Sequence, residues 1–146
     1  TEEQFDSMLN VQFKGVFFLS QKLYPRIADN GRVVNISTGL TRFVIEGFGA
    51  YSAMKGAIEI LTKYMAKEWG KRGIRVNAVA PGAIATDFGG GSVRDNQQMR
   101  DFIASNIALG RVGEADDIGP VVASLCTDEL GWVNGTRLEA SGGQML

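Results

Sequence analysis

Short segments rich in β-branched residues alternate with longer helical segments along this chain, and this alternation constrains its fold most. Residues 32–37 and 74–80 each have a nearly continuous apolar centre, which favours strands that are buried on both faces of a sheet. Parallel strands need a crossover connection, which is usually a helix. The alternation therefore predicts parallel strands in a three-layer α/β sandwich.

Local signals place the individual elements. Thr1 and Gln4 match the capping-box pattern, which predicts a helix that starts at once, and Pro25 ends or bends its last turn. Apolar side chains cover most of the girth of this helix, so we expect a sheet on one side and a partner subunit on the other. Gly73 ends the second helix, and Pro120 is tolerated in the first turn of the last one. We expect helices over residues 1–27, 50–71, 96–105 and from 114 onward, and strands over 32–37, 74–80 and 136–140.

Composition excludes several classes of function. The 146 residues suit one domain over positions 1–146. The chain has no histidine and only one cysteine, Cys126, which excludes histidine-dependent nucleophiles and cysteine or histidine metal sites, and we expect no metal. A net charge of −1 without a basic block argues against nucleic-acid binding. The apolar runs are too short to span a membrane, and without a visible signal peptide we expect a cytoplasmic protein.

Tyr51 and Lys55 form the most informative pair. They stand four residues apart near the start of the second predicted helix, so they lie on one helix face. An ammonium beside a phenol favours phenolate, so we expect a lowered pKa for Tyr51 and proton transfer near neutral pH. Ligands of open α/β sheets bind beyond the carboxyl ends of the strands, and Ser37, Thr38 and Pro81 stand there.

An ordered set of motifs makes the pair specific. Its members are residues 14–19 (KGVFFL), 34–37 (VNIS), 51–55 (YSAMK), 75–82 (RVNAVAPG), 110–113 (GRVG) and 142–143 (GG). Together they resemble the second half of the short-chain dehydrogenase/reductase family. The resemblance implies a Rossmann-like, doubly wound parallel sheet without its N-terminal strands and helices. It also implies an oxidoreductase that transfers a hydride between NAD or NADP and an alcohol or carbonyl substrate.

The resemblance also implies roles for residues. Tyr51 would be the general acid/base, with Lys55 lowering its pKa and holding the nicotinamide ribose. The family's catalytic serine aligns with Thr38, and Ser37 is the rival, because neighbouring strand residues face opposite ways. Gln12 stands where the family usually has an asparagine that holds a water of a proton relay. The segment that would line the nicotinamide contains Pro81, Gly82, Ile84 and Thr86.

The family's glycine-rich nucleotide turn has no counterpart here, because no G-x-G-x-x-G motif opens a helix. We therefore expect the C-terminal part of such an enzyme. An alternative is a non-catalytic homologue or a truncated fragment that acts by association. In the family the two long helices commonly pair across a dimer axis, so we expect a homodimer or homotetramer.

Overall fold

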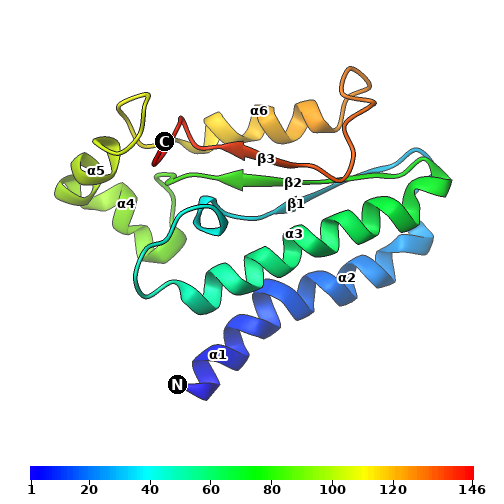
Figure 1. The fold of residues 1–146 in the computed structure, drawn as a ribbon, viewed down its shortest axis with the longest axis horizontal. Coiled ribbons are helices and arrows are strands. Elements are labelled where there is room, and N and C mark those ends of the chain that lie inside the picture. The colour runs from blue at the N-terminus through cyan, green and yellow to red at the C-terminus, as the bar shows by residue number, and fades with distance from the viewer.

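The computed structural model describes all residues 1–146 and contains a parallel sheet with helices on both faces (Figure 1). Short 3₁₀ turns lie at Tyr24–Arg26, Gly39–Thr41, Gly70–Arg72 and Phe88–Gly91. The main elements are α1 (Glu2–Leu9), a π-helical segment (Asn10–Lys14), α2 (Gly15–Leu23), β1 (Arg32–Ile36), α3 (Gly49–Trp69), β2 (Arg75–Pro81), α4 (Ser92–Asp95), α5 (Gln97–Ala104), α6 (Ala115–Leu125) and β3 (Arg137–Ala140).

The three strands are parallel and follow the order β1-β2-β3. Arg32 of β1 is in register with Arg75 of β2, and Ala78 of β2 with Arg137 of β3. The helix α3 lies on one face of the sheet and α6 on the other (Figure 1). The crossover from β1 to β2 contains α3, and the crossover from β2 to β3 contains α6. Both move one strand in the same direction across the sheet but lie on opposite faces, so the two crossovers have opposite handedness. The predicted three-layer arrangement is confirmed.

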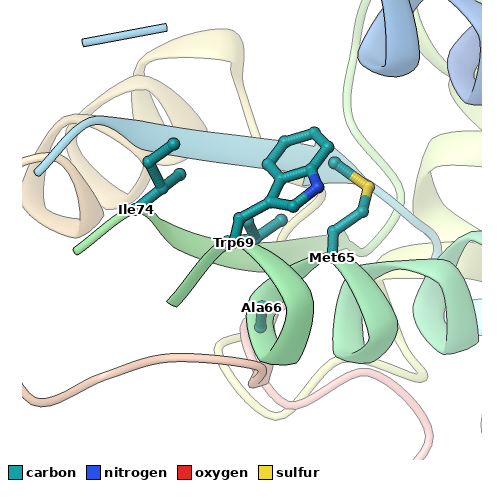
Figure 2. Close-up of a cluster of buried hydrophobic side chains, with 5 residues drawn as sticks. Met65, Ala66, Trp69 and Ile74 are labelled. Atoms are coloured by element: carbon teal, nitrogen blue, oxygen red, sulfur yellow. The ribbon is translucent and has the colours of Figure 1, made fainter. Parts of the chain in front are cut away.

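The main core lies between α3 and the sheet. Trp69 is 8% exposed and packs with Met65, Ala66, Ile74 and Val76 in one cluster, which Figure 2 shows in close-up. Outside this cluster, the ring of Tyr24 lies with its centroid 4.8 Å from that of Trp69. Burial of these apolar side chains fixes α3 to β2, and thereby fixes the start of α3 relative to the ends of the strands.

Two sequence predictions about helices need correction. The first helix is not continuous: a π-helical segment separates α1 from α2, and neither helix has a fully buried residue. The helix α1 and the π-helical segment pack against α3, and phenylalanines of α2 such as Phe17 and Phe18 remain exposed. Pro120 lies in the interior of α6 and not in its first turn. The predicted capping box at Thr1 is confirmed, since Thr1 Oγ1 accepts from the backbone N–H of Gln4 at 3.3 Å.

Gly73 closes the α3 region as predicted, in the left-handed conformation with φ of 68° that glycine adopts without strain. No helix combines the length and the hydrophobicity that a membrane crossing requires.

Candidate functional site

A cavity of about 690 Å³ opens beyond the carboxyl ends of β1 and β2. The start of α3, the π-helical segment and the loops after β1 and β2 all contribute to its walls. Every site residue predicted from the sequence lines it: Gln12, Ser37, Thr38, Tyr51, Lys55, Pro81, Gly82, Ile84 and Thr86. Residues that are as far apart as 12 and 86 in the sequence therefore meet at one site.

Tyr51 and Lys55 lie on the first turns of α3 and face this cavity. Lys55 Nζ lies 5.7 Å from the centroid of the Tyr51 ring and donates a hydrogen bond to the carbonyl oxygen of Ile36 at 2.9 Å. The carbonyl at the end of β1 thus holds the ammonium beside the phenol ring. Burial lowers the pKa of Lys55, because an apolar environment disfavours its charged form.

The predicted lowering of the Tyr51 pKa is wrong. Burial raises the pKa of the Tyr51 phenol, and a hydrogen bond with the Thr38 side chain lowers it only in part. Desolvation disfavours phenolate more strongly than the neighbouring groups favour it. The phenol therefore stays protonated at neutral pH, which is the state that a proton donor requires.

Thr38 and Ser37 point to different partners. Thr38 is buried and pairs with Tyr51 through its side chain, while its Oγ1 also accepts from the backbone N–H of Leu40 at 3.3 Å. The Ser37 hydroxyl donates instead to Glu59 Oε1 at 2.6 Å. Of the two side chains, that of Thr38 therefore acts on the Tyr51 phenol, and that of Ser37 is bound to Glu59.

A partly buried polar network lies behind Thr38. Glu59 Oε1 accepts hydrogen bonds from Ser37 Oγ at 2.6 Å, from Thr41 Oγ1 at 2.7 Å and from Arg137 Nε at 2.8 Å. Arg137 also donates to the backbone carbonyl of Thr38 at 3.1 Å, and the Thr41 hydroxyl, which shares its single proton between this carbonyl and Glu59, lies 3.0 Å from it. The network therefore holds the backbone carbonyl of Thr38 through two side chains. Sequence reasoning missed it, because Glu59 and Arg137 stand in no recognised motif.

Gln12 lies in the π-helical segment and lines the cavity. A π-turn inserts one residue into a helix and occurs often at functional sites. Here it lies at the part of the first helix that reaches the cavity. Its hydrogen-bond pattern cannot be read from residue spacing, which explains why the sequence predicted an unbroken helix.

The segment after β2 is held by Gln144, a residue that sequence reasoning also missed. Gln144 is buried, and its Oε1 accepts from the backbone N–H of Ala83 at 2.9 Å. Gly82 lies so close to this side chain and to Ser141 that a Cβ at position 82 would meet both at 2.8 Å. Glycine is therefore required for this close approach. Thr86 Oγ1 accepts from the backbone N–H of Phe88 at 3.3 Å.

Aromatic rings form much of the remaining wall, through Phe43, Phe48 and Phe88. The ring of Phe88 lies 5.9 Å from that of Tyr51, measured between centroids. Exposed fractions of 42% for Phe48 and 62% for Phe88 place both at the mouth of the cavity. An apolar cavity with a few convergent polar groups is the usual form of a small-molecule site.

This arrangement can donate a proton and stabilise negative charge on an oxygen atom. Tyr51 and Thr38 offer two neighbouring hydroxyl groups, and Lys55 offers an ammonium on the same wall. Three kinds of group in the cavity could contact a nicotinamide riboside: the Lys55 ammonium, the Thr86 hydroxyl and the apolar surface of Pro81 and Ile84. Their chemistry suits an amide, sugar hydroxyls and a flat ring, so the residues fit this part of a nicotinamide cofactor.

Comparison with known proteins places these residues in context. A family model described as Enoyl-(Acyl carrier protein) reductase matches residues 1–145. The NADPH-dependent aldehyde reductase-like protein, chloroplastic, of Arabidopsis thaliana is 40% identical over 97% of this chain and 52% of its own length. The 3-oxoacyl-[acyl-carrier-protein] reductase FabG of Thermotoga maritima is 35% identical over 99% of this chain and 58% of its own.

Solved structures agree with the fold. The reductase LugOII, described as promiscuous and as catalysing keto-reduction at C1 in lugdunomycin biosynthesis, has a TM-score of 0.92 and 43% identity. The match covers 99% of this chain and 56% of the LugOII chain. The angucycline C-6 ketoreductase LanV with bound NADP has a TM-score of 0.92 and 34% identity, with coverage of 99% and 55%. The chain spans about half the length of the curated relatives it matches.

Proposed function

The chain belongs to the short-chain dehydrogenase/reductase family, and on this premise we propose that its site interconverts a carbonyl and an alcohol with NAD or NADP as the hydride carrier. The observation that carries the proposal is the meeting of Tyr51, Thr38 and Lys55 on one cavity wall. The NADPH-dependent relative and the NADP-bound neighbour favour NADP as the cofactor. The bound nicotinamide would supply the hydride that carbonyl reduction needs.

Tyr51 is the proton donor in this proposal. Its raised pKa keeps the phenol protonated at neutral pH, so it can give a proton to the substrate oxygen as negative charge develops there. The Thr38 hydroxyl would donate a hydrogen bond to the same oxygen, which stabilises that charge. The rigid backbone of Thr38, held by Arg137 and Thr41, keeps this donor in place.

Lys55 has two tasks in the proposal. Its ammonium stabilises the Tyr51 phenolate that remains after proton donation, because opposite charges attract at close range. It would also bind the ribose hydroxyls of the cofactor, with Pro81, Gly82, Ile84 and Thr86 lining the nicotinamide. The hydrogen bond from Lys55 Nζ to the Ile36 carbonyl orients the side chain for both tasks. Gln12, which lines the same cavity, would contribute to the relay that returns the proton to Tyr51.

Replacement of Tyr51 by phenylalanine tests the proposal in the natural polypeptide that carries these residues. The ring and its packing against Phe88 remain, and only the hydroxyl is lost. We expect NADPH-dependent carbonyl reduction to fall by about 10²-fold or more. Tyr24→Phe is the matched control, since Tyr24 lies outside the cavity lining and its ring packs near Trp69. Undiminished reduction by Tyr51→Phe would contradict the proposal.

We also propose that the chain self-associates as a homodimer or homotetramer through its long helices. Large apolar side chains on α2 and α3, among them Phe18, Leu19, Ile60 and Tyr64, are 45–64% exposed. Apolar patches of this kind mark interaction surfaces. Sedimentation velocity tests the proposal, and a monomer at micromolar concentration would contradict it.

A further inference from the structure

We propose that the substrate of this site is a neutral, apolar carbonyl compound with an aromatic ring next to its carbonyl group. The inference rests on the proposed function and adds to it the chemical class of the substrate. It depends on two properties of the cavity: an aromatic wall beside Tyr51, and the lack of an unpaired guanidinium on the segments that form the cavity.

The aromatic wall lies beside the proton donor. The rings of Phe88 and Tyr51 are 5.9 Å apart and tilted by 48°, and Phe43 and Phe48 line the same cavity. Much of the surface of Phe48 and Phe88 is still accessible. A flat apolar ligand would cover this surface and would gain both the burial of apolar area and the preferred geometry of aromatic pairs.

The charges around the cavity argue against an anionic substrate. Lys55 is its only charged lining residue, and the proposed function already assigns its ammonium to the Tyr51 phenolate and the cofactor ribose. The arginines on the segments around the cavity are all paired with carboxylates. These pairs are Arg42 with Glu139, Arg94 with Asp87 and Asp95, Arg100 with Glu114, and Arg111 with Asp117. The carboxylate beside each of these guanidiniums would repel a carboxylate or phosphate on the substrate.

The polar groups that remain suit a single oxygen atom. Tyr51 and Thr38 present hydroxyls to the cavity, and the wall around them is formed largely by apolar side chains. A substrate with one carbonyl acceptor and an apolar body leaves no polar group of its own unpaired. A short keto acid would bring a carboxylate for which the cavity has no free partner, and the pantetheine arm of a coenzyme A thioester would place its amides against apolar side chains.

Competing substrates test the inference in the natural polypeptide, with NADPH as the cofactor. The probes are 1-tetralone, acetoacetate and acetoacetyl-coenzyme A. We expect kcat/KM for 1-tetralone to exceed that for either anionic probe by about tenfold or more. Phe88→Ala should lower kcat/KM for 1-tetralone by about threefold to tenfold, the size of one aromatic contact. Phe102→Ala is the control, since Phe102 is 69% exposed and lies outside the cavity lining.

A binding measurement separates the substrate class from catalysis. The δ1-methyl NMR signals of Ile45 and Ile84, which line the cavity, should shift saturably with 1-tetralone, while those of Ile58 and Ile74 should not. Saturable NMR shifts without any turnover would overturn the proposed function and would support aromatic ketones as the class of ligand that the cavity binds. Turnover that favours an anionic probe, or an equal effect of Phe88→Ala and Phe102→Ala, would overturn the ligand class. Neither shifts nor turnover would overturn both.

Discussion

Arg137 Nε donates to Glu59 Oε1 over 2.8 Å, and this ion pair joins the first residue of β3 to α3 behind the catalytic hydroxyl that we assign to Thr38. The side chains are 21% and 17% exposed, so solvent screens the pair only partly. The same guanidinium holds the backbone carbonyl of Thr38 at 3.1 Å. The pair therefore connects a strand at one edge of the sheet to the site at the end of another strand.

Replacement of Glu59 by glutamine should weaken both the fold and the site. Three donors converge on one carboxylate oxygen, and an amide in its place lacks the charge that balances Arg137. We expect the free energy of unfolding to fall by about 1–3 kcal/mol and kcat to fall more than KM changes. Glu68→Gln is the matched control, because Glu68 is an exposed residue of the same helix. Chemical denaturation and steady-state kinetics measure the two effects, and equal behaviour of both variants would refute the role of the network.

Substitutions at Thr38 and Ser37 distinguish the two hydroxyls. Thr38→Val keeps the shape of the side chain and removes its hydroxyl, so we expect kcat to fall by about 10²-fold, with recovery in Thr38→Ser. Ser37→Ala removes a donor to Glu59 and should chiefly lower stability, by about 1 kcal/mol. Steady-state kinetics with one ketone measures both variants. A larger loss of activity in Ser37→Ala than in Thr38→Val would assign the catalytic hydroxyl to Ser37 instead.

Much of the site follows from the sequence because its residues lie at strand ends and at helical spacing. The i, i+4 relation places Tyr51 and Lys55 on one face of α3, and the ends of parallel strands bring Thr38 and Pro81 to the same edge of the sheet. Regular periodicity also located the strands and α3 within a few residues. The pairing of Thr38 with Tyr51 needed coordinates, because a strand end can turn either of two neighbouring hydroxyls toward a site.

Other features depend on contacts between distant segments, which spacing does not reveal. Glu59 and Arg137 are 78 residues apart, and Gln144 reaches Ala83 from the chain's last residues. The π-turn around Gln12 is a change of hydrogen bonding within a sequence that favours a helix throughout. The raised pKa of Tyr51 reflects burial, a tertiary property that outweighs the local effect expected from Lys55.

Glu139 gives the fold a defined pH dependence. A hydrogen bond from the Arg42 guanidinium lowers the pKa of this carboxyl from 4.5 to about 2. Because the folded-state pKa is depressed, the stabilisation is full above pH 4.5 and is lost as pH falls from about 4.5 to about 2. Glu139→Gln should therefore lower the free energy of unfolding by about 1–3 kcal/mol at pH 7. Urea unfolding should show a smaller difference at pH 2.5, and a difference that does not change with pH would contradict this account.

The most direct test of the central claim is isotope transfer at the site of Tyr51. A ketone such as 1-tetralone is reduced by the natural polypeptide with NADPH deuterated at the transferable C4 position, and the alcohol is examined by mass spectrometry. Our account predicts deuterium on the carbinol carbon for the native sequence and an alcohol yield lower by about 10²-fold for Tyr51→Phe. An alcohol without deuterium, or an equal yield from Tyr51→Phe, would contradict it.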